Sequence, residues 1–552
     1  MDRPAHVDYV ALACNHKDMR SRPLAVLAAV AVAASLLVAP TAMAAPVAPA
    51  APAAQAAAPA VTRLEGANQY SIAVRASQAA FPTAGSADVV VVVNGEDYQS
   101  AVVASAAAAA LNGPVIYVSK SSITPSAKAE IARLAPAKII VIGDTSLVSA
   151  KVAAPLKAQQ PNYLRIGSDD YTEAEQLVRL AFPDGADHVY LAAGKKSATS
   201  VSASALAAAD GAPLLLARTT DTKVRVAAKD LYAELGTTRV TVIGGYISAG
   251  YVKELGKLGM TVDRLTTTAS TSANIGIANR ITNPGGVLVA SATDYDSALG
   301  ALATATATRS PIVLTTPYCA SPELLSYLKT SSATSMTVVG TTAVVRGLVE
   351  SLEPCRDITK ASSTWVFVNK KNKLKPASYV PSGLRLPNIV RTGSHKLKDA
   401  AADALEEMAA DARTAGVGRV GIVSGYRSYS TQKALYARYV RTNGQAWADS
   451  QSARAGFSEH QTGLSADLAA CSASSCSSIY SIASTPQGKW LAKNSWKYGF
   501  VMRYENGKTS TTGYAFEPWH FRFVGTELAA DYHAGGFTTL ERYFGKPAAP
   551  KY

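Results

Sequence analysis

"KIIVIGD" (138–144), "RVTVIGG" (239–245) and "MTVVGT" (336–341) are three versions of one short stretch of sequence. Each is a run of mostly apolar, β-branched residues that closes on a glycine: Gly143, Gly244 or Gly340. Short runs of this composition, bounded by turn residues, are typical of buried strands. Because the run recurs at intervals of about one hundred residues, the sequence predicts that the middle of the chain repeats one structural unit.

The rest of each unit follows the same order. An Arg-Leu or Arg-Ile pair opens it, followed by a helix-like segment, an apolar run, an alanine-rich helix-like stretch and a second apolar run entered through a proline. The opening arginines are Arg63, Arg165 and Arg264, and the prolines are Pro114, Pro213 and Pro311. Strand-like runs that alternate with helical segments predict βαβ units on parallel sheets. The predicted copies span residues 63–162, 163–262 and 263–355.

The glycine turns do not indicate a nucleotide site, because they lack the G-x-G-x-x-G spacing and its acidic partner. With the arginine openings and the proline strand entries, the turns instead resemble the cell-wall-binding repeat that occurs in threes in Gram-positive surface proteins. That resemblance implies three Rossmann-like α/β lobes that attach to an anionic cell-wall polymer. A simple spacer that holds a second domain off a surface is the alternative interpretation.

The composition changes after Cys355, and residues 356–552 are predicted to form a separate domain. Two stretches in it place a histidine close to a glutamate: "GFSEHQTGLSAD" (456–467) and "FEPWHFRF" (516–523). A catalytic zinc site needs three protein ligands and an open position. His460, Asp467 and His520 are therefore predicted to bind Zn²⁺, and Glu517 is predicted to act as a base without binding the metal.

Local patterns predict the elements around these residues. Apolar positions from Leu397 to Ala412 follow helical spacing over 396–416, with Gly416 at its C-terminal end. "RVGIVSGYRS" (419–428) is predicted to be a strand that enters a turn, and 430–444 a second helix. An apolar strand is expected at "WVFV" (365–368). Phe521 and Phe523 alternate with polar neighbours, which predicts a strand around His520.

The motifs "VNKKNKLKPASYVPSGL" (368–384), "SGYRSYSTQ" (424–432), "SARAGFSEHQTGLSAD" (452–467) and "EPWHFRFVG" (517–525) closely resemble the VanY-type D-alanyl-D-alanine carboxypeptidases, zinc peptidases of family M15. The resemblance implies an α+β domain with an antiparallel sheet. By position it assigns the same three zinc ligands and the same base, makes Arg427 a catalytic and substrate-binding arginine, and places Gln432 and Ser458 at the substrate site.

The activity that this resemblance implies is removal of the C-terminal D-alanine from peptidoglycan stem peptides. L,D-carboxypeptidase or D,D-dipeptidase activity on the same substrates is an alternative. So is a wall-binding surface protein whose peptidase activity is secondary.

The N-terminal segment is predicted to be an export signal. Arg20 and Arg22 precede the apolar run 24–38, and Ala42-Met43-Ala44 fits the small-x-small cleavage pattern. Residues 1–44 are thus a predicted signal peptide, with Met19 as a possible true start, and 45–62 an Ala/Pro linker. The run is short for a membrane span, and no later run is long enough. The product is expected to be secreted and associated with the cell wall.

Four cysteines lie after the predicted signal. An even number in an exported chain permits disulfides, and their spacing matches no common structural zinc pattern. Proximity in the sequence predicts the pairs Cys471–Cys476 and Cys319–Cys355.

Positive charge is concentrated in the last third of the chain. From Arg356 onward there are 26 Lys and Arg against 14 Asp and Glu, which accounts for most of the net charge of +14. Such a field attracts polyanions. For an exported chain the expected partners are anionic wall polymers, not nucleic acid.

Overall fold

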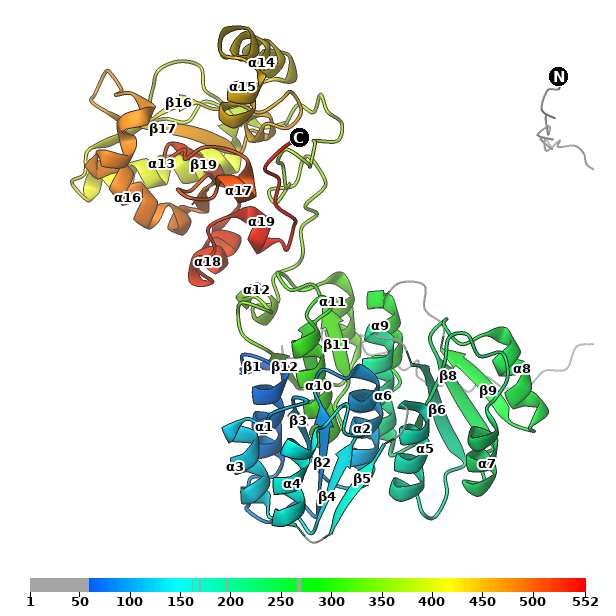
Figure 1. Cartoon of the computed structure of the whole chain (residues 1–552). Helices are drawn as coiled ribbons and strands as arrows, with labels where there is room; N and C mark the ends of the chain where they lie inside the picture. Colours follow the sequence, from blue (N-terminus) through cyan, green and yellow to red (C-terminus); the bar gives the residue numbers. More distant parts are fainter. Residues whose placement is uncertain (1–58, 161, 168–169, 195–196, 266–269) are drawn as a thin grey trace, which may run out of the picture. The chain divides into compact units, whose positions relative to one another are not determined.

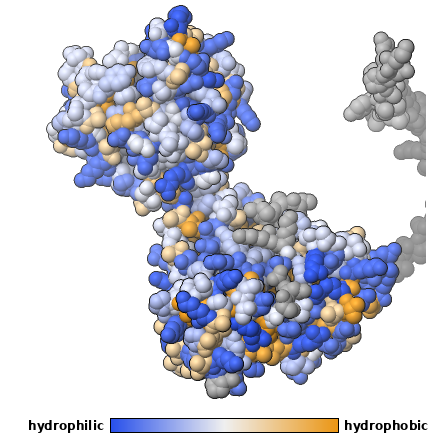
Figure 2. All heavy atoms as spheres, in the orientation of Figure 1, coloured by the Kyte–Doolittle hydropathy of each residue, from blue (hydrophilic) through white to orange (hydrophobic). Residues whose placement is uncertain are grey.

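The computed structural model describes residues 59–160, 162–167, 170–194, 197–265 and 270–552 (Figure 1). The predicted signal peptide and the linker up to residue 58 lie outside the described residues. In the described part of the chain no helix is both long and apolar enough to span a bilayer. On the face shown in Figure 2, apolar residues lie in scattered groups among hydrophilic ones.

Three parallel sheets occupy the repeat region, as predicted, and each has four strands. Their strands, in spatial order, are β3 (Val115–Val118), β2 (Val89–Asn94), β4 (Lys138–Ile142) and β5 (Tyr163–Ile166); β7 (Leu214–Ala217), β6 (His188–Ala193), β8 (Arg239–Ile243) and β9 (Thr261–Leu265); and β11 (Ile312–Thr315), β10 (Gly286–Ser291), β12 (Ser335–Val339) and β1 (Ala60–Leu64). The three glycine-closed runs form the inner strands β4, β8 and β12.

The short strand at each arginine opening completes the sheet of the preceding copy. β5 pairs with β4, and β9 pairs with β8. β1 instead pairs with β12, so the first strand of the region completes the last sheet. Each copy therefore contributes its opening strand to the sheet of another copy, in a closed cycle that spacing along the sequence alone does not indicate.

The three opening arginines form the same pair of hydrogen bonds in each copy. Arg165 donates from Nη1 to the carbonyl of Gly143 at 2.6 Å and from Nη2 to the carbonyl of Val148 at 2.9 Å. Arg264 does the same with Gly244 and Ile247, at 3.1 and 2.8 Å. Arg63 repeats the arrangement with the carbonyls of Gly340 and Val345. Each guanidinium thus fixes the loop that follows an inner strand.

Twelve described helices cover these sheets. They are α1 (Gln69–Ala80), α2 (Tyr98–Ala110), α3 (Pro125–Leu134), α4 (Ala150–Gln159), α5 (Asp170–Ala181), α6 (Ala198–Asp210), α7 (Val226–Glu234), α8 (Ala249–Lys257), α9 (Ser270–Ala278), α10 (Tyr295–Thr308), α11 (Pro322–Thr330) and α12 (Gly347–Glu350). The alanine-rich helices α2, α6 and α10 contact one another. Small side chains permit this close approach, and one hydrophobic core runs through all three copies.

The C-terminal part is an α+β domain built on a five-stranded sheet. Its strand order is β14 (Val390–Arg391), β16 (Arg419–Ser424), β17 (Ser465–Cys471), β19 (His520–Phe523) and β18 (Phe500–Met502). β14 and β16 are parallel, and the remaining neighbours are antiparallel. A second small sheet pairs β13 (Leu384–Arg385) with β15 (Leu397–Lys398).

Helices and 3₁₀ turns surround this sheet. They are α13 (Asp399–Thr414), α14 (Tyr429–Asn443), α15 (Gln445–Gln451), η1 (Glu459–Thr462), η2 (Ile479–Ser484), α16 (Pro486–Asn494), η3 (Ser495–Tyr498), α17 (Thr509–Thr512), α18 (Thr526–Ala534) and α19 (Leu540–Tyr543). The predicted helices and strands of this part are confirmed with two exceptions. Leu397 lies in β15, just before its helix. The stretch 365–368 is buried but pairs with no strand, so the strand predicted there is wrong.

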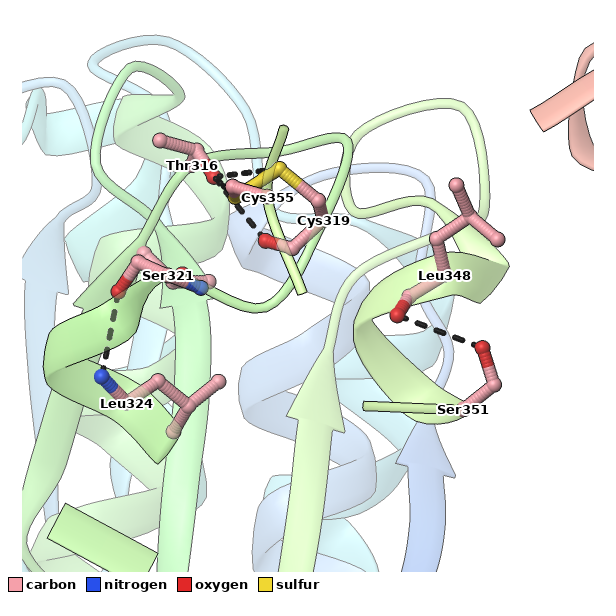
Figure 3. The surroundings of a disulfide bond; sticks show 8 residues. Thr316, Cys319, Ser321, Leu324, Leu348, Ser351 and Cys355 are labelled. Atoms are coloured by element: carbon pink, nitrogen blue, oxygen red, sulfur yellow. Dashed lines mark hydrogen bonds between the residues drawn. A yellow bond between two sulfur atoms is a disulfide. The ribbon is translucent and has the colours of Figure 1, made fainter. Parts of the chain in front are cut away.

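Both predicted disulfides are present. Cys319–Cys355 joins the loop before α11 to the segment after α12, and the Thr316 hydroxyl lies 3.2 Å from the Cys355 Sγ (Figure 3). Cys471–Cys476 closes a short loop at the end of β17. From loop length alone, the first bridge stabilises the fold by about 4 kcal/mol and the second by about 2 kcal/mol.

We predict that Arg264→Ala destabilises the repeat region by about 2 kcal/mol, because two carbonyls of the loop after β8 lose a charged donor. Chemical denaturation followed by circular dichroism measures the change. The control is Arg239→Ala, which removes an exposed arginine from the start of β8 and should shift the midpoint little. Equal effects of the two substitutions would contradict the role given to the opening arginines.

Candidate metal centre

The three predicted ligands meet at the centre of the five-stranded sheet. Asp467 on β17 and His520 on β19 are directly paired across the antiparallel ladder. His460 lies on the 3₁₀ turn η1 and reaches the same point because the chain reverses at Gly463, whose φ of +71° suits glycine. Their potential ligand atoms lie within 4.8 Å of one another, and all three residues are buried.

The contacts show which atoms face the common centre. His460 Nε2 lies 3.2 Å from Asp467 Oδ2, and His520 Nδ1 lies 3.0 Å from Asp467 Oδ1. The two imidazole rings are nearly perpendicular, with centroids 4.9 Å apart. Two imidazole nitrogens and one carboxylate form the ligand set of a catalytic zinc site that leaves a fourth position open. The residues present therefore fit Zn²⁺.

The other nitrogen of each imidazole has its own partner. His460 Nδ1 lies 2.8 Å from the carbonyl of Gly425, so it carries the hydrogen and donates. His520 Nε2 lies 3.2 Å from Oε2 of Glu459 and donates to that carboxylate. Each of these hydrogen bonds holds a hydrogen on the nitrogen that faces away from the ligand cluster, so the other nitrogen of each ring is the one that would bind a metal.

Burial sets the electrostatics of the site. It would raise the pKa of Asp467, but His460 and His520 outweigh it and hold that pKa well below its usual range. Burial likewise opposes ionisation of Glu459, but Arg503 and Arg522 keep its pKa well below the ordinary value. Both carboxylates are therefore ionised.

Glu517 differs from these two carboxylates. Burial raises its pKa to about 8; His520 and Arg427 lower the pKa, and Asp467 raises it. Its Oε2 lies 3.9 Å from His520 Nδ1, at the edge of the ligand cluster. A nearby cation favours the charged form of a carboxyl group, so Glu517 is poised to change protonation state when the site is filled.

A cavity of about 140 Å³ opens above the ligands. Among the residues that line it are Arg427, Ser458 and Glu517. The sequence motif also predicted that Gln432 lies at the substrate site. In the structure Gln432 is fully buried one layer behind, and its Oε1 accepts a hydrogen bond from Arg427 Nη1 at 2.8 Å. Gln432 holds the arginine in place.

Sequence reasoning missed several residues of this site. Tyr504 and Tyr514 line the cavity wall, and Trp447 and Tyr480 stand exposed at its rim. They carry no motif that the sequence analysis used. Glu459 is the glutamate directly before His460 in the quoted stretch 456–467, but the sequence analysis gave it no role.

Comparison with known proteins gives two family matches. The model described as VanY: D-alanyl-D-alanine carboxypeptidase matches residues 394–526. The model described as cell wall binding domain 2 matches residues 63–153, within the first predicted copy.

Individual relatives match the C-terminal part. "Putative carboxypeptidase YodJ" of Bacillus subtilis (strain 168) is 36% identical over 203 residues, which cover 36% of this chain and 73% of that protein. A D-alanyl-D-alanine carboxypeptidase of Enterococcus faecium is 39% identical over 142 residues, 26% of this chain and 42% of that one. The solved structure of the LdcB LD-carboxypeptidase is 36% identical over 34% of this chain and 88% of its own, with a TM-score of 0.32.

Fold and ligand set together define a zinc metallopeptidase that carries a cell-wall-binding region. More closely, the chain belongs to the family of VanY D-alanyl-D-alanine carboxypeptidases through its C-terminal part.

We predict that His460→Ala abolishes stoichiometric zinc binding, because the two ligands that remain would bind the ion too weakly for it to survive dialysis. Elemental analysis of dialysed protein measures this. His533→Ala is the matched control, since it removes an imidazole that stacks on Trp496 at 4.3 Å, away from the ligand cluster. Zinc retained at one ion per chain in His460→Ala would remove His460 from the ligand set.

Proposed function

We propose that the chain is an exported zinc D,D-carboxypeptidase that removes the C-terminal D-alanine from peptidoglycan stem peptides. The observation that carries the proposal is that Glu517 and Arg427 face the same cavity as the His460–Asp467–His520 cluster. A carboxypeptidase needs a metal, a base and a cation for the substrate carboxylate, and this cavity brings together residues for all three. The Enterococcus faecium relative named as a D-alanyl-D-alanine carboxypeptidase supports the choice of substrate.

Zinc, when bound at the three ligands, supplies Lewis-acid chemistry that polarises a carbonyl and lowers the pKa of water. The protein supplies the proton transfers. In this proposal Glu517 accepts a proton from the attacking water and returns it to the leaving amine of D-alanine. Its buried position beside the ligands keeps the carboxyl close to both reacting atoms.

Arg427 is proposed to hold a substrate oxygen. Its Nη1 donates to Gln432 and its Nη2 donates to Ser424 Oγ at 2.9 Å. These two bonds orient the planar guanidinium and leave other N–H groups of the fork for a carboxylate or carbonyl oxygen. Ser458, which is buried and lines the cavity, is the second proposed reader of the substrate terminus.

We predict that Glu517→Gln lowers kcat by at least about 10²-fold while zinc content stays unchanged, because the base is lost but the ligands remain. Release of D-alanine from a soluble pentapeptide measures turnover. Glu527→Gln, an exposed change on α18, serves as the control for loss of a carboxylate. Wild-type turnover in Glu517→Gln would contradict the proposed base.

Substrate choice is tested with three defined substrates: a stem pentapeptide ending in D-alanyl-D-alanine, the tetrapeptide, and free D-alanyl-D-alanine. We predict that mass spectrometry finds cleavage of the pentapeptide at the highest kcat/KM. Preference for the tetrapeptide would establish the L,D-carboxypeptidase alternative, and preference for the free dipeptide would establish the dipeptidase.

The repeats are proposed to hold the enzyme at an anionic polymer of the cell wall. The family match within the first copy and the threefold repetition of its sheet support this role. The basic surplus of the C-terminal part also attracts anionic walls, but that attraction acts over about 8 Å at physiological salt and weakens as salt rises. Salt dependence therefore distinguishes the two kinds of attachment.

We predict that full-length Glu517→Gln protein stays on isolated cell walls at high salt, whereas a fragment of residues 356–552 is released. Sedimentation with walls at low and high ionic strength measures both. The fragment keeps its main core but loses contacts with Leu348 and Cys319, so its folding is first verified by zinc content. If salt releases the full-length chain as readily as the fragment, the spacer interpretation replaces the anchor.

A further inference from the structure

Behind His520 lies a set of four fully buried charged residues, here called the four-charge cluster. Its members are Glu459, Arg503, Arg522 and Glu541, whose side chains are at most 1% exposed. They come from η1, the segment after β18, β19 and α19, so tertiary folding alone brings them together.

Hydrogen bonds within the cluster are well formed. Glu459 Oε1 accepts from Arg503 Nε at 2.9 Å and from Arg522 Nη1 at 3.1 Å. Arg503 also makes a bidentate pair with Glu541, with bonds of 2.9 and 2.8 Å. Arg522 Nη2 donates to the carbonyls of Thr364 and Val366. Two carboxylates and two guanidinium groups leave the cluster with no net charge.

The stability of the fold does not by itself explain why four charged side chains are buried together. Desolvation of buried ion pairs offsets most of their attraction, and apolar side chains of similar volume often stabilise a core as well or better. The cluster does reach the metal centre at one atom. Oε2 of Glu459 lies 3.2 Å from His520 Nε2, while Oε1 of the same carboxylate is held by the two arginines.

We propose that Glu459 is a positioning residue for the metal site: held by Arg503 and Arg522, it accepts the Nε2 hydrogen of His520 and orients the ring so that Nδ1 is the nitrogen that would bind zinc. The proposal rests on zinc binding at His460, Asp467 and His520. The corresponding hydrogen bond of His460 is accepted by the neutral carbonyl of Gly425. The charged partner of His520 therefore makes its imidazole the more basic of the two nitrogen ligands.

Two substitutions within the cluster separate positioning from mere structure. Glu459→Gln and Glu541→Gln each replace one buried carboxylate by an isosteric amide, and each leaves the cluster with the same excess positive charge. Only Glu459 contacts a metal ligand; Glu541 contacts Arg503 and Asn369. A purely structural cluster predicts similar effects of the two changes, whereas positioning predicts that Glu459→Gln alone weakens zinc binding.

The test measures zinc affinity of the full-length chain by competition with a chromogenic chelator. We expect Glu459→Gln to bind zinc about 10- to 100-fold more weakly than wild type, and Glu541→Gln to stay within about threefold of wild type. ¹⁵N NMR of the zinc-loaded protein gives a second readout: the hydrogen on Nε2 of the His520 imidazole should be protected from exchange in wild type and Glu541→Gln, and should exchange faster in Glu459→Gln.

Glu459→Asp keeps the experiment decisive if Glu459→Gln fails to fold. It preserves the charge balance of the cluster but shortens the side chain by one methylene, so we expect weaker zinc binding and a smaller loss of stability than in Glu459→Gln. Unchanged zinc affinity in the folded Glu459 variants, or an equal loss in Glu541→Gln, would overturn the proposal. Stoichiometric zinc in His460→Ala would instead show that the metal site itself is wrong.

Discussion

The cross-strand pair of Asp467 and His520 is the contact on which the catalytic part depends. Antiparallel pairing of β17 with β19 places these residues opposite each other, with His520 Nδ1 3.0 Å from Asp467 Oδ1. Because side chains alternate across a strand, a shift of one residue would turn one ligand to the other face of the sheet. Phe521, the next residue on β19, is buried in the core. The packing that stabilises the sheet therefore also fixes the register that builds the site.

The residues that support the ligands in space are not their neighbours in sequence. His460, Asp467, Glu517 and His520 were predictable because each stands in a short motif with a chemical meaning. The support of these residues comes from elsewhere in the chain: Gly425 holds His460, and Arg503 and Arg522 hold the partner of His520. These long-range contacts leave no mark in local spacing. Gln432 is a further example of a position that local sequence cannot predict. Its motif indicated the substrate site, but not that the Gln432 side chain lies behind Arg427.

In the repeat region, too, local sequence predicted the elements but not the contacts between them. Apolar runs closed by glycine predicted each inner strand, because a buried parallel strand needs a continuous apolar stretch. The sequence shows the opening arginines as a recurring pattern but does not show which groups they bind. Each donates to two carbonyls of a loop, which lies earlier in the sequence for Arg165 and Arg264 and nearly three hundred residues later for Arg63. Pairing of β1 with β12 was likewise beyond local reasoning. The strand at 365–368 was predicted wrongly because buried apolar residues there pack without strand pairing.

The charges of the cavity connect this architecture to the proposed substrate. The four-charge cluster is neutral, so it orients His520 without changing the charge of the site. Bound zinc would add two positive charges, and Asp467 and an ionised Glu517 would balance them with one negative charge each. Arg427 then leaves the cavity with a positive surplus, and its guanidinium is oriented by neutral partners that do not neutralise it. A cavity with that balance favours a ligand with one negative charge. The free carboxylate at the end of a stem peptide has that charge, and an internal peptide bond does not.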